Sequence, residues 1–175
     1  MKIETDGGRV LIDEDTTRAF YRAHGENNNC ECSGCRNFRA CLPKLNDRVK
    51  EFFGSVGIDD MAVISEIVPL AADSDGMMLY GGFFHVVGEL EDIPSVTYEI
   101  PCCEYAVDEN GNRTTVITGR ETRYHTETSH HRLWDDFDIW FSGSLGMVPE
   151  GFPEPTLQLE IYAKLPWVLD EENTY

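Results

Sequence analysis

The sequence lacks any long hydrophobic run. No stretch approaches the roughly 20 consecutive apolar residues that a membrane-spanning helix needs. The first six residues, 1–6, are mostly polar and lack the apolar core of a secretory signal. We therefore expect a cytoplasmic protein that does not enter a membrane. Thiols stay reduced in that compartment, so we expect its six cysteines as thiols or metal ligands rather than as disulfides.

Positive charge is also scarce. The chain has 14 Lys and Arg against 32 Asp and Glu, which gives a formal net charge of −18. Such an acidic protein repels phosphate backbones and anionic lipids, so we expect neither nucleic acid nor a membrane as its partner. The expected partner is an unidentified protein or small molecule.

Familiar catalytic motifs are missing as well. The sequence contains no Gly-rich phosphate loop and no Gly-x-Ser-x-Gly nucleophile motif. A binding or interaction module is therefore a better interpretation than an enzyme.

The 175 residues fit one domain, residues 1–175, whose pattern changes about a third of the way along. Residues 1–60 are expected to form a helical segment that carries a cysteine knuckle. Residues 61–175 alternate apolar and polar side chains with the period of β-strands, and no long helical pattern follows. The sequence predicts an α+β fold: an antiparallel sheet or sandwich of about six to eight strands, with the cysteine-rich helical segment packed on it.

Two short helices are expected near the cysteines. Asn37 predicts the cap of a helix that ends near Cys41, and Pro43 suits the first turn of a second helix. Gly57 lies where a helix commonly ends. The second helix has an apolar stripe at helical spacing, formed by Leu45, Val49, Phe52, Phe53 and Val56.

The strongest strand prediction covers residues 77–90. Apolar side chains occur at both parities there, which is typical of a central strand covered on both faces. The Gly81-Gly82 pair indicates a bulge or a close backbone contact. Farther on, the Asn-Gly pair within 108–112 predicts a hairpin turn between two strands. Cys102 and Cys103 alternate along the first of them and are expected in the core.

Three of the cysteines form one Cys-x-Cys-x-x-Cys run, and this is the clearest candidate site. Cys30, Cys32 and Cys35 can converge on a single metal ion from one turn of the chain. Cys41 is expected as the fourth ligand, with His24 as its rival. Such a closed set predicts a structural zinc site, because it leaves no position open for water. An open site would require one of these thiolates, such as that of Cys41, not to coordinate the metal.

Other interpretations remain. An iron–sulfur cluster is the second choice of cofactor, because its usual cysteine spacings differ from this one. Three reduced thiols without a metal are the plainest alternative. A further alternative is an enzyme with a reactive cysteine or an open metal position near Cys30–Cys41. Another is a β domain that binds a small ligand or glycan. The last alternative would use aromatic side chains, namely Tyr80, Phe83, Phe84, Trp134, Trp140 and Trp167.

Residues 125–138 hold a second group of polar side chains. Their spacing matches no ligand motif, so we expect a solvated surface there. The group comprises His125, Glu127, His130, His131, Asp135, Asp136 and Asp138.

Four segments resemble a family of uncharacterised bacterial proteins, found mostly in Gram-positive species. They are 30–38 (Cys-Glu-Cys-Ser-Gly-Cys-Arg-Asn-Phe), 52–59, 80–88 and 166–169, and the first matches the family's Cys-x-Cys-x-x-Cys-x-Asn-Phe signature. The resemblance covers most of the chain and implies an intact member, but no activity. The family pattern has Lys-Pro after Gly-Ile-Asp, where this chain has Asp60-Met61-Ala62.

Overall fold

The computed structural model describes residues 1–25, 29–73, 75–107 and 113–175. Within them the chain forms three α-helices and nine strands, which confirms the predicted α+β class. The helices are α1 (Glu14–His24), α2 (Ser33–Cys41) and α3 (Asp47–Ser55), with short 3-10 helices at Leu42–Lys44 and Met61–Val63. The strands are β1 (Lys2–Thr5), β2 (Gly8–Ile12), β3 (Glu66–Ala72), β4 (Met77–Glu91), β5 (Val96–Val107), β6 (Arg113–His125), β7 (His131–Trp134), β8 (Phe137–Ser142) and β9 (Thr156–Pro166).

Strand β4 is the centre of a seven-stranded antiparallel sheet, as its two apolar faces predicted. The sheet has the order β1-β2-β4-β9-β8-β7, and β3 also pairs with β4. Strand β9 follows one edge of β4, while β3 and β2 share the other edge at different ends. The predicted close contact at the glycine pair is also present, because a Cβ at Gly82 would lie 2.5 Å from the carbonyl oxygen of Glu66.

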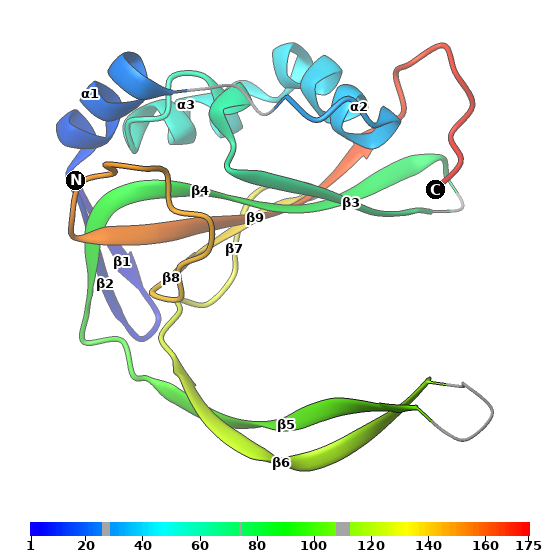
Figure 1. Cartoon of the computed structure of the whole chain (residues 1–175). Coiled ribbons are helices and arrows are strands. Elements are labelled where there is room, and N and C mark those ends of the chain that lie inside the picture. The colour runs from blue at the N-terminus through cyan, green and yellow to red at the C-terminus, as the bar shows by residue number, and fades with distance from the viewer. Residues whose placement is uncertain (26–28, 74, 108–112) are drawn as a thin grey trace.

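The three helices lie across one face of this sheet (Figure 1). Phe38 of α2 and Phe53 of α3 are fully buried against the central strand. Their ring centroids lie 5.5 Å from Tyr80 and 5.0 Å from Phe84, respectively. The core therefore sits between helices and sheet, and burying its large side chains is the main source of stability.

Both helices near the cysteines begin at other residues than predicted. Helix α2 begins at Ser33, because the Cys32 side chain accepts the backbone N–H of Cys35 and so caps the helix; Asn37 lies in the helix interior. Helix α3 begins only at Asp47, with Asn46 as its cap. Pro43 belongs to the preceding 3-10 helix. The predicted end is correct, since Gly57 has a φ of +93°, which glycine adopts without strain.

The segment 1–60 is not helical throughout. Its first twelve residues form the β1–β2 hairpin, which extends the main sheet through β2 and β4. Within the described ranges, no helix is long and apolar enough to cross a membrane.

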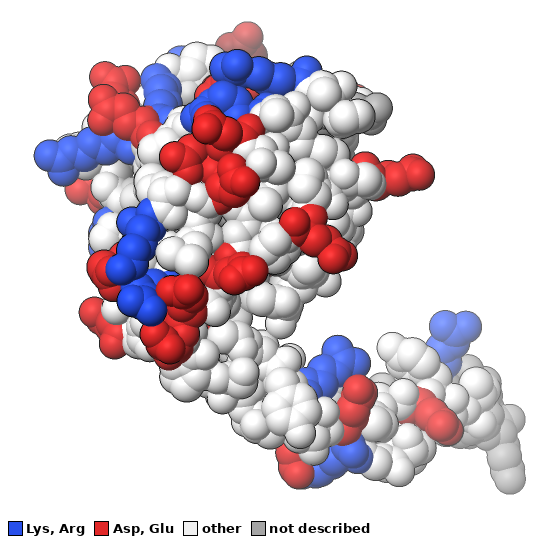
Figure 2. Space-filling model, turned by 90° about the vertical axis from the view of Figure 1, so that its left-hand side faces the viewer, with Lys and Arg blue, Asp and Glu red and all other residues white. Residues whose placement is uncertain are grey.

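Strands β5 and β6 form a separate two-stranded sheet, which we call the arm (Figure 1). Their antiparallel pairing confirms the predicted hairpin, whereas its turn at 108–112 lies outside the described residues. The arm projects from the body, and acidic and basic side chains stand beside each other on it (Figure 2). Cys102 is half-buried and Cys103 exposed. Their predicted core placement is wrong, because both faces of the arm are largely exposed.

Candidate metal centre

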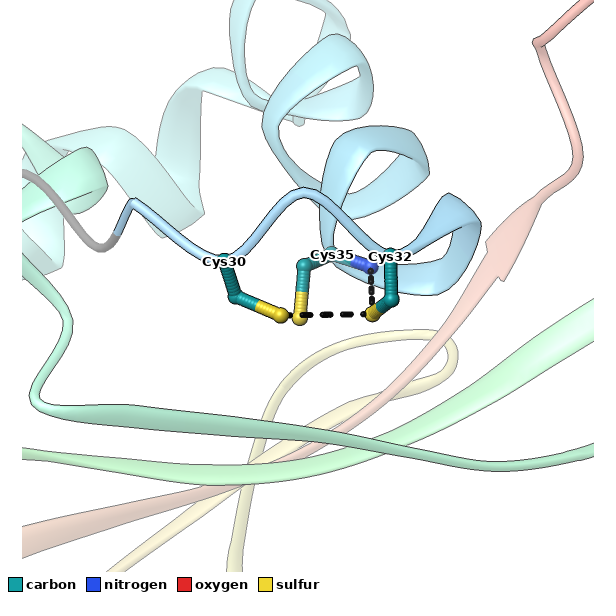
Figure 3. A group of neighbouring side chains, drawn as sticks. All are labelled: Cys30, Cys32 and Cys35. Carbon is teal, nitrogen blue, oxygen red and sulfur yellow. Dashed lines mark hydrogen bonds between the residues drawn. The ribbon is translucent and has the colours of Figure 1, made fainter.

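Three of the predicted ligands come together at the start of α2. The sulfur atoms of Cys30, Cys32 and Cys35 all lie within 4.8 Å of one another. Cys30 and Cys32 come from the loop before the helix and Cys35 from its first turn, and their side chains point to a common region (Figure 3). Cys30 and Cys32 are exposed, while Cys35 is buried. The cluster is thus open to solvent on one side.

Capping of helix α2 fixes the position of Cys32. Its sulfur accepts the backbone N–H of Cys35 at 3.4 Å and the thiol of Cys30 at 3.5 Å. The first N–H groups of a helix have no partner within the helix and carry partial positive charge. A sulfur at this position is therefore stabilised as a thiolate.

Cys35 is the anchored member of the cluster. Its side chain is 2 % exposed, and its thiol donates to the carbonyl oxygen of Ile67 on β3 at 3.7 Å. The first turn of α2 thus rests on a strand of the main sheet, so one of the three sulfur atoms is held by the core.

Gly34 permits this close approach, a role that sequence reasoning missed. A Cβ at this position would lie 2.6 Å from the side chain of Pro69 and 3.0 Å from the hydroxyl of Tyr175. Its backbone is also occupied, since its N–H donates to Tyr175 at 3.3 Å and its carbonyl accepts the hydroxyl of Tyr80 at 3.0 Å. A glycine between two cysteines was the only sequence signal for this contact.

The cluster holds two kinds of thiol. Partial burial tends to raise the pKa of Cys32, but donors from the Cys35 backbone and from the Cys35, Cys30 and Tyr175 side chains outweigh it and lower that pKa to about 7. Burial raises the pKa of Cys35 well above its ordinary value, and its hydrogen bonds to Cys32 and Cys30 add to this. Near neutral pH, Cys32 is the readiest thiolate.

Two arginines lie near the cluster in the sequence, and both carry carboxylate partners. Arg36 pairs with Glu171 of the C-terminal segment, and Arg39 pairs with Glu31 at 3.3 Å. Their positive charge is therefore shared with these carboxylates and does not act on the sulfurs alone.

The structure does not bring either candidate for the fourth ligand into the cluster. Cys41 lies at the far end of α2, where its thiol donates to the carbonyl oxygen of Pro166 at 3.3 Å. It is 2 % exposed, and burial raises its pKa to about 11. His24 ends α1 and stacks on Phe20, with ring centroids 5.1 Å apart.

A buried network holds α2 from its other side. Asn37 is fully buried, and its amide nitrogen donates to the hydroxyl of Tyr80 at 2.9 Å and to the carbonyl of Pro166 at 3.0 Å. Its amide oxygen accepts the N–H of Val168 at 2.7 Å. The helix is thus bound to both β4 and the segment after β9. Sequence reasoning assigned Asn37 to a helix cap and missed this role.

The second polar group does not form a comparable site. His125 and Glu127 are paired at 3.3 Å, and His130 stacks on Trp140 with ring centroids 4.1 Å apart. In the part of the chain that the structure describes, only the three-cysteine cluster brings three possible metal ligands within reach of one ion.

The aromatic side chains expected in a ligand groove are dispersed. Tyr80 and Phe84 are fully buried in the core. Trp134 is 38 % exposed and lies under the guanidinium of Arg48, 5.1 Å from it. These residues do not form one exposed row, so the glycan-binding alternative gains no support from them.

The chemistry of the cluster is that of soft ligands. Thiolates prefer zinc, copper(I) and iron–sulfur clusters over hard cations such as magnesium. With three sulfurs and one exposed side, the cluster can hold such an ion and leave a coordination position open. No protein-family model matches this chain, and no curated protein or solved structure matches it either.

Proposed function

We propose that Cys30, Cys32 and Cys35 bind one thiophilic metal ion, zinc in the first instance, and leave its fourth position open. The observation that carries this proposal is the convergence of the three sulfurs within 4.8 Å, with Cys41 turned into the core. The open position would take water, a small ligand or a side chain of a protein partner. The chain would then act as a metal-dependent binding module.

The sulfur spacing supports zinc. At a Zn–S distance of about 2.3 Å, two sulfurs of a tetrahedral site lie about 3.8 Å apart. The sulfurs of Cys30 and Cys32 are 3.5 Å apart, and all three lie within 4.8 Å. Small side-chain rotations therefore suffice to seat the ion. An iron–sulfur cluster usually takes four cysteine ligands, so it fits three less well.

The position of the cluster argues for an exchangeable ion. Asn37 and Phe38 already hold α2 on the sheet through hydrogen bonds and core packing. A metal is therefore not needed to attach the helix. An ion at the exposed edge would be accessible to a partner, a chelator or a competing ligand. The resemblance to the bacterial family stays a prediction and adds no activity.

Zinc titration against a chromophoric chelator tests the proposal. The protein should bind one equivalent, and Cys30→Ser, Cys32→Ser and Cys35→Ser should each weaken binding by about tenfold or more. Cys103→Ser on the arm controls for incidental thiol binding and should bind as the parent does. Cys41→Ala separates a three-cysteine site from a four-cysteine site, and we expect unchanged affinity.

Two results would overturn the proposal. One is retention of less than about a tenth of an equivalent of zinc or iron after purification without chelator, together with no measurable uptake on titration. The other is equal zinc affinity of the Cys103→Ser and Cys32→Ser variants, which would show that the binding does not depend on the cluster.

A reactive cysteine is the second candidate function, and Cys32 favours it. Its thiol is exposed. Partial burial tends to raise its pKa, but four hydrogen-bond donors to the sulfur outweigh this effect and lower the pKa to about 7. Exposed low-pKa thiols are the nucleophiles of cysteine chemistry. Alkylation at neutral pH with and without zinc separates the candidates, since a bound ion should protect Cys32.

A further inference from the structure

Cys32 and Cys35 form a pair whose members differ in access to solvent. They are spaced Cys-Ser-Gly-Cys, and Cys32 caps the helix whose first turn contains Cys35. The Cys32 sulfur accepts the N–H of Cys35, and the two sulfurs lie within 4.8 Å of each other. Cys32 is exposed, whereas Cys35 is 2 % exposed. An external reagent can therefore reach the first sulfur but not the second.

We propose that this pair carries out thiol–disulfide exchange with low-molecular-weight disulfides, with Cys32 as the attacking thiol and Cys35 as the resolving thiol. This activity goes beyond metal binding and does not need a metal. Its consequence for the metal does rest on the proposed function: oxidation of two of the three ligands would release the ion.

The reaction consists of two exchanges. The Cys32 thiolate attacks one sulfur of a disulfide R–S–S–R, so that a Cys32–S–S–R bond forms and RS⁻ leaves. The sulfur of Cys35 then attacks the sulfur of Cys32 and gives its proton to solvent or to the leaving thiolate. The Cys32–Cys35 bond forms and a second R–SH is released. Two protein thiols are oxidised and one small disulfide is reduced to two thiols; an excess of R–SH reverses both steps.

The surroundings suit this division of roles. Cys35 is held by the carbonyl oxygen of Ile67 and faces the cluster rather than bulk solvent, so its accessible target is the mixed disulfide on Cys32. Gly34 between the two cysteines has no side chain to block the approach, and its neighbours leave no room for one. Cys30 lies 3.5 Å from Cys32 and is the competing partner for the resolving step.

The test uses the full chain, reduced and stripped of metal, and incubated with oxidised glutathione. After acid quenching and alkylation, intact mass and peptide mapping identify the products. The parent protein should lose two hydrogen atoms and map to a Cys32–Cys35 disulfide. Cys35→Ser should not form the internal disulfide of the parent, and the double variant Cys30→Ser/Cys35→Ser, which also lacks the competing thiol, should stop at the glutathione adduct on Cys32. Cys32→Ser should react at least about tenfold more slowly, because the remaining sulfurs lack the exposed cap position.

The variants are chosen so that folding does not confuse the result. Serine is a favoured helix cap, so Cys32→Ser keeps α2 capped while it removes the sulfur. Cys103→Ser removes an exposed thiol from the arm and should form the internal disulfide at the parent's rate. Far-ultraviolet circular dichroism of each variant confirms the fold before the assay.

The outcomes separate this inference from the metal proposal. A Cys30–Cys32 disulfide, a glutathione adduct that accumulates on the parent protein, or an unchanged rate in Cys32→Ser would overturn the assignment of roles. Disulfide formation in a protein that binds no zinc would support this activity while removing the metal proposal. If both hold, one equivalent of zinc should slow the oxidation of the parent by about tenfold or more.

Discussion

Helix α2 separates two regions with opposite properties. The loop at its N-terminal end, which we call its exposed edge, carries the sulfurs of Cys30 and Cys32, and both residues are exposed. Its buried side carries Asn37 and Phe38, which are both fully buried: Asn37 hydrogen-bonds to Tyr80 and Pro166 of the sheet, and Phe38 packs against Tyr80. The buried side determines whether the helix stays in place, while the exposed edge determines what it can bind. Four experiments address this division, from the largest expected effect to the smallest.

The largest loss of stability is expected from Asn37→Ala. The change leaves the N–H of Val168 without its partner, removes one of the two donors to the carbonyl of Pro166, and opens a cavity beside Tyr80. We expect the free energy of unfolding to fall by about 2–4 kcal/mol, measured by urea denaturation.

Asn29→Ala is the matched control for this substitution, since Asn29 is exposed in the loop before Cys30. It should change stability by less than about 0.5 kcal/mol. Equal losses of unfolding free energy in the two variants would contradict the distinction between the buried side and the exposed edge.

Gly34→Ala tests where the two regions meet. Its Cβ would lie 2.6 Å from Pro69, so the start of α2 must move away from β3. We expect a loss of about 1–3 kcal/mol in stability. Displaced sulfurs should also bind zinc more weakly.

Gly54→Ala in α3 is the matched control, because a Cβ there meets nothing within 4 Å. It should leave stability unchanged or raise it by up to about 1 kcal/mol, since alanine favours a helix more than glycine does. A stable Gly34→Ala protein with parental zinc affinity would contradict the proposed packing constraint.

The third experiment uses pH to separate the core from the site. Burial lowers the pKa of His85, which is fully enclosed and hydrogen-bonded to Ser65 at 2.9 Å, below its ordinary 6.5. In the unfolded chain the pKa of His85 is the ordinary 6.5, and in the folded protein it is lower. Between these two values the unfolded chain holds one more proton on His85 than the folded protein does, so stability falls as the pH drops below about 6.5. The slope is at most about 1.4 kcal/mol per pH unit for one proton. Denaturation across this range should show the loss, and His85→Gln should flatten it.

Zinc affinity should follow a different group. All three cysteines bind zinc as thiolates, and the pKa of Cys35 is raised, so affinity falls as the pH falls; the fall should become steeper below about pH 7, where Cys32 also takes up a proton. His85→Gln should leave this binding profile unchanged. A variant that alters both profiles together would show that core and site are coupled.

The smallest effect is expected from Cys32→Ser without metal. Serine keeps the helix cap, and the side chain is exposed. Metal-free stability should therefore change by less than about 0.5 kcal/mol, as measured by thermal or urea denaturation. A loss comparable to that of Asn37→Ala would mean that the cluster itself holds the helix.

Much of the fold was predictable because its signals are local. The apolar run in 77–90 predicted a central strand, and the stripe that includes Val49 and Phe53 predicted a packed helix; the structure has both. The predicted cover on both faces of the strand is incomplete, because Met77, Leu79 and Phe83 are only half-buried. Cys102 and Cys103 show the limit of this reasoning. Alternation indicates a strand, but whether a second layer covers that strand depends on distant parts of the chain.

The position of Cys41 outside the cluster follows from one helix boundary. With Asn37 as the cap, Cys41 could turn back toward the other cysteines. Because α2 starts at Ser33, Cys35 and Cys41 belong to one helix. Six residues span about 9 Å along its axis and place the two side chains on different sides. Cys41 therefore faces Pro166 and the core instead of the cluster.

The sequence alone determined that three thiols stand within six residues of each other, that a central strand and a packed helix follow, and that the chain is strongly acidic. These properties depend on residue identity and short-range spacing. Only the tertiary structure decided which thiols meet solvent, which one is buried, and where the fourth cysteine points. Those outcomes depend on how α2 rests on β3 and β9, contacts between residues far apart in the chain.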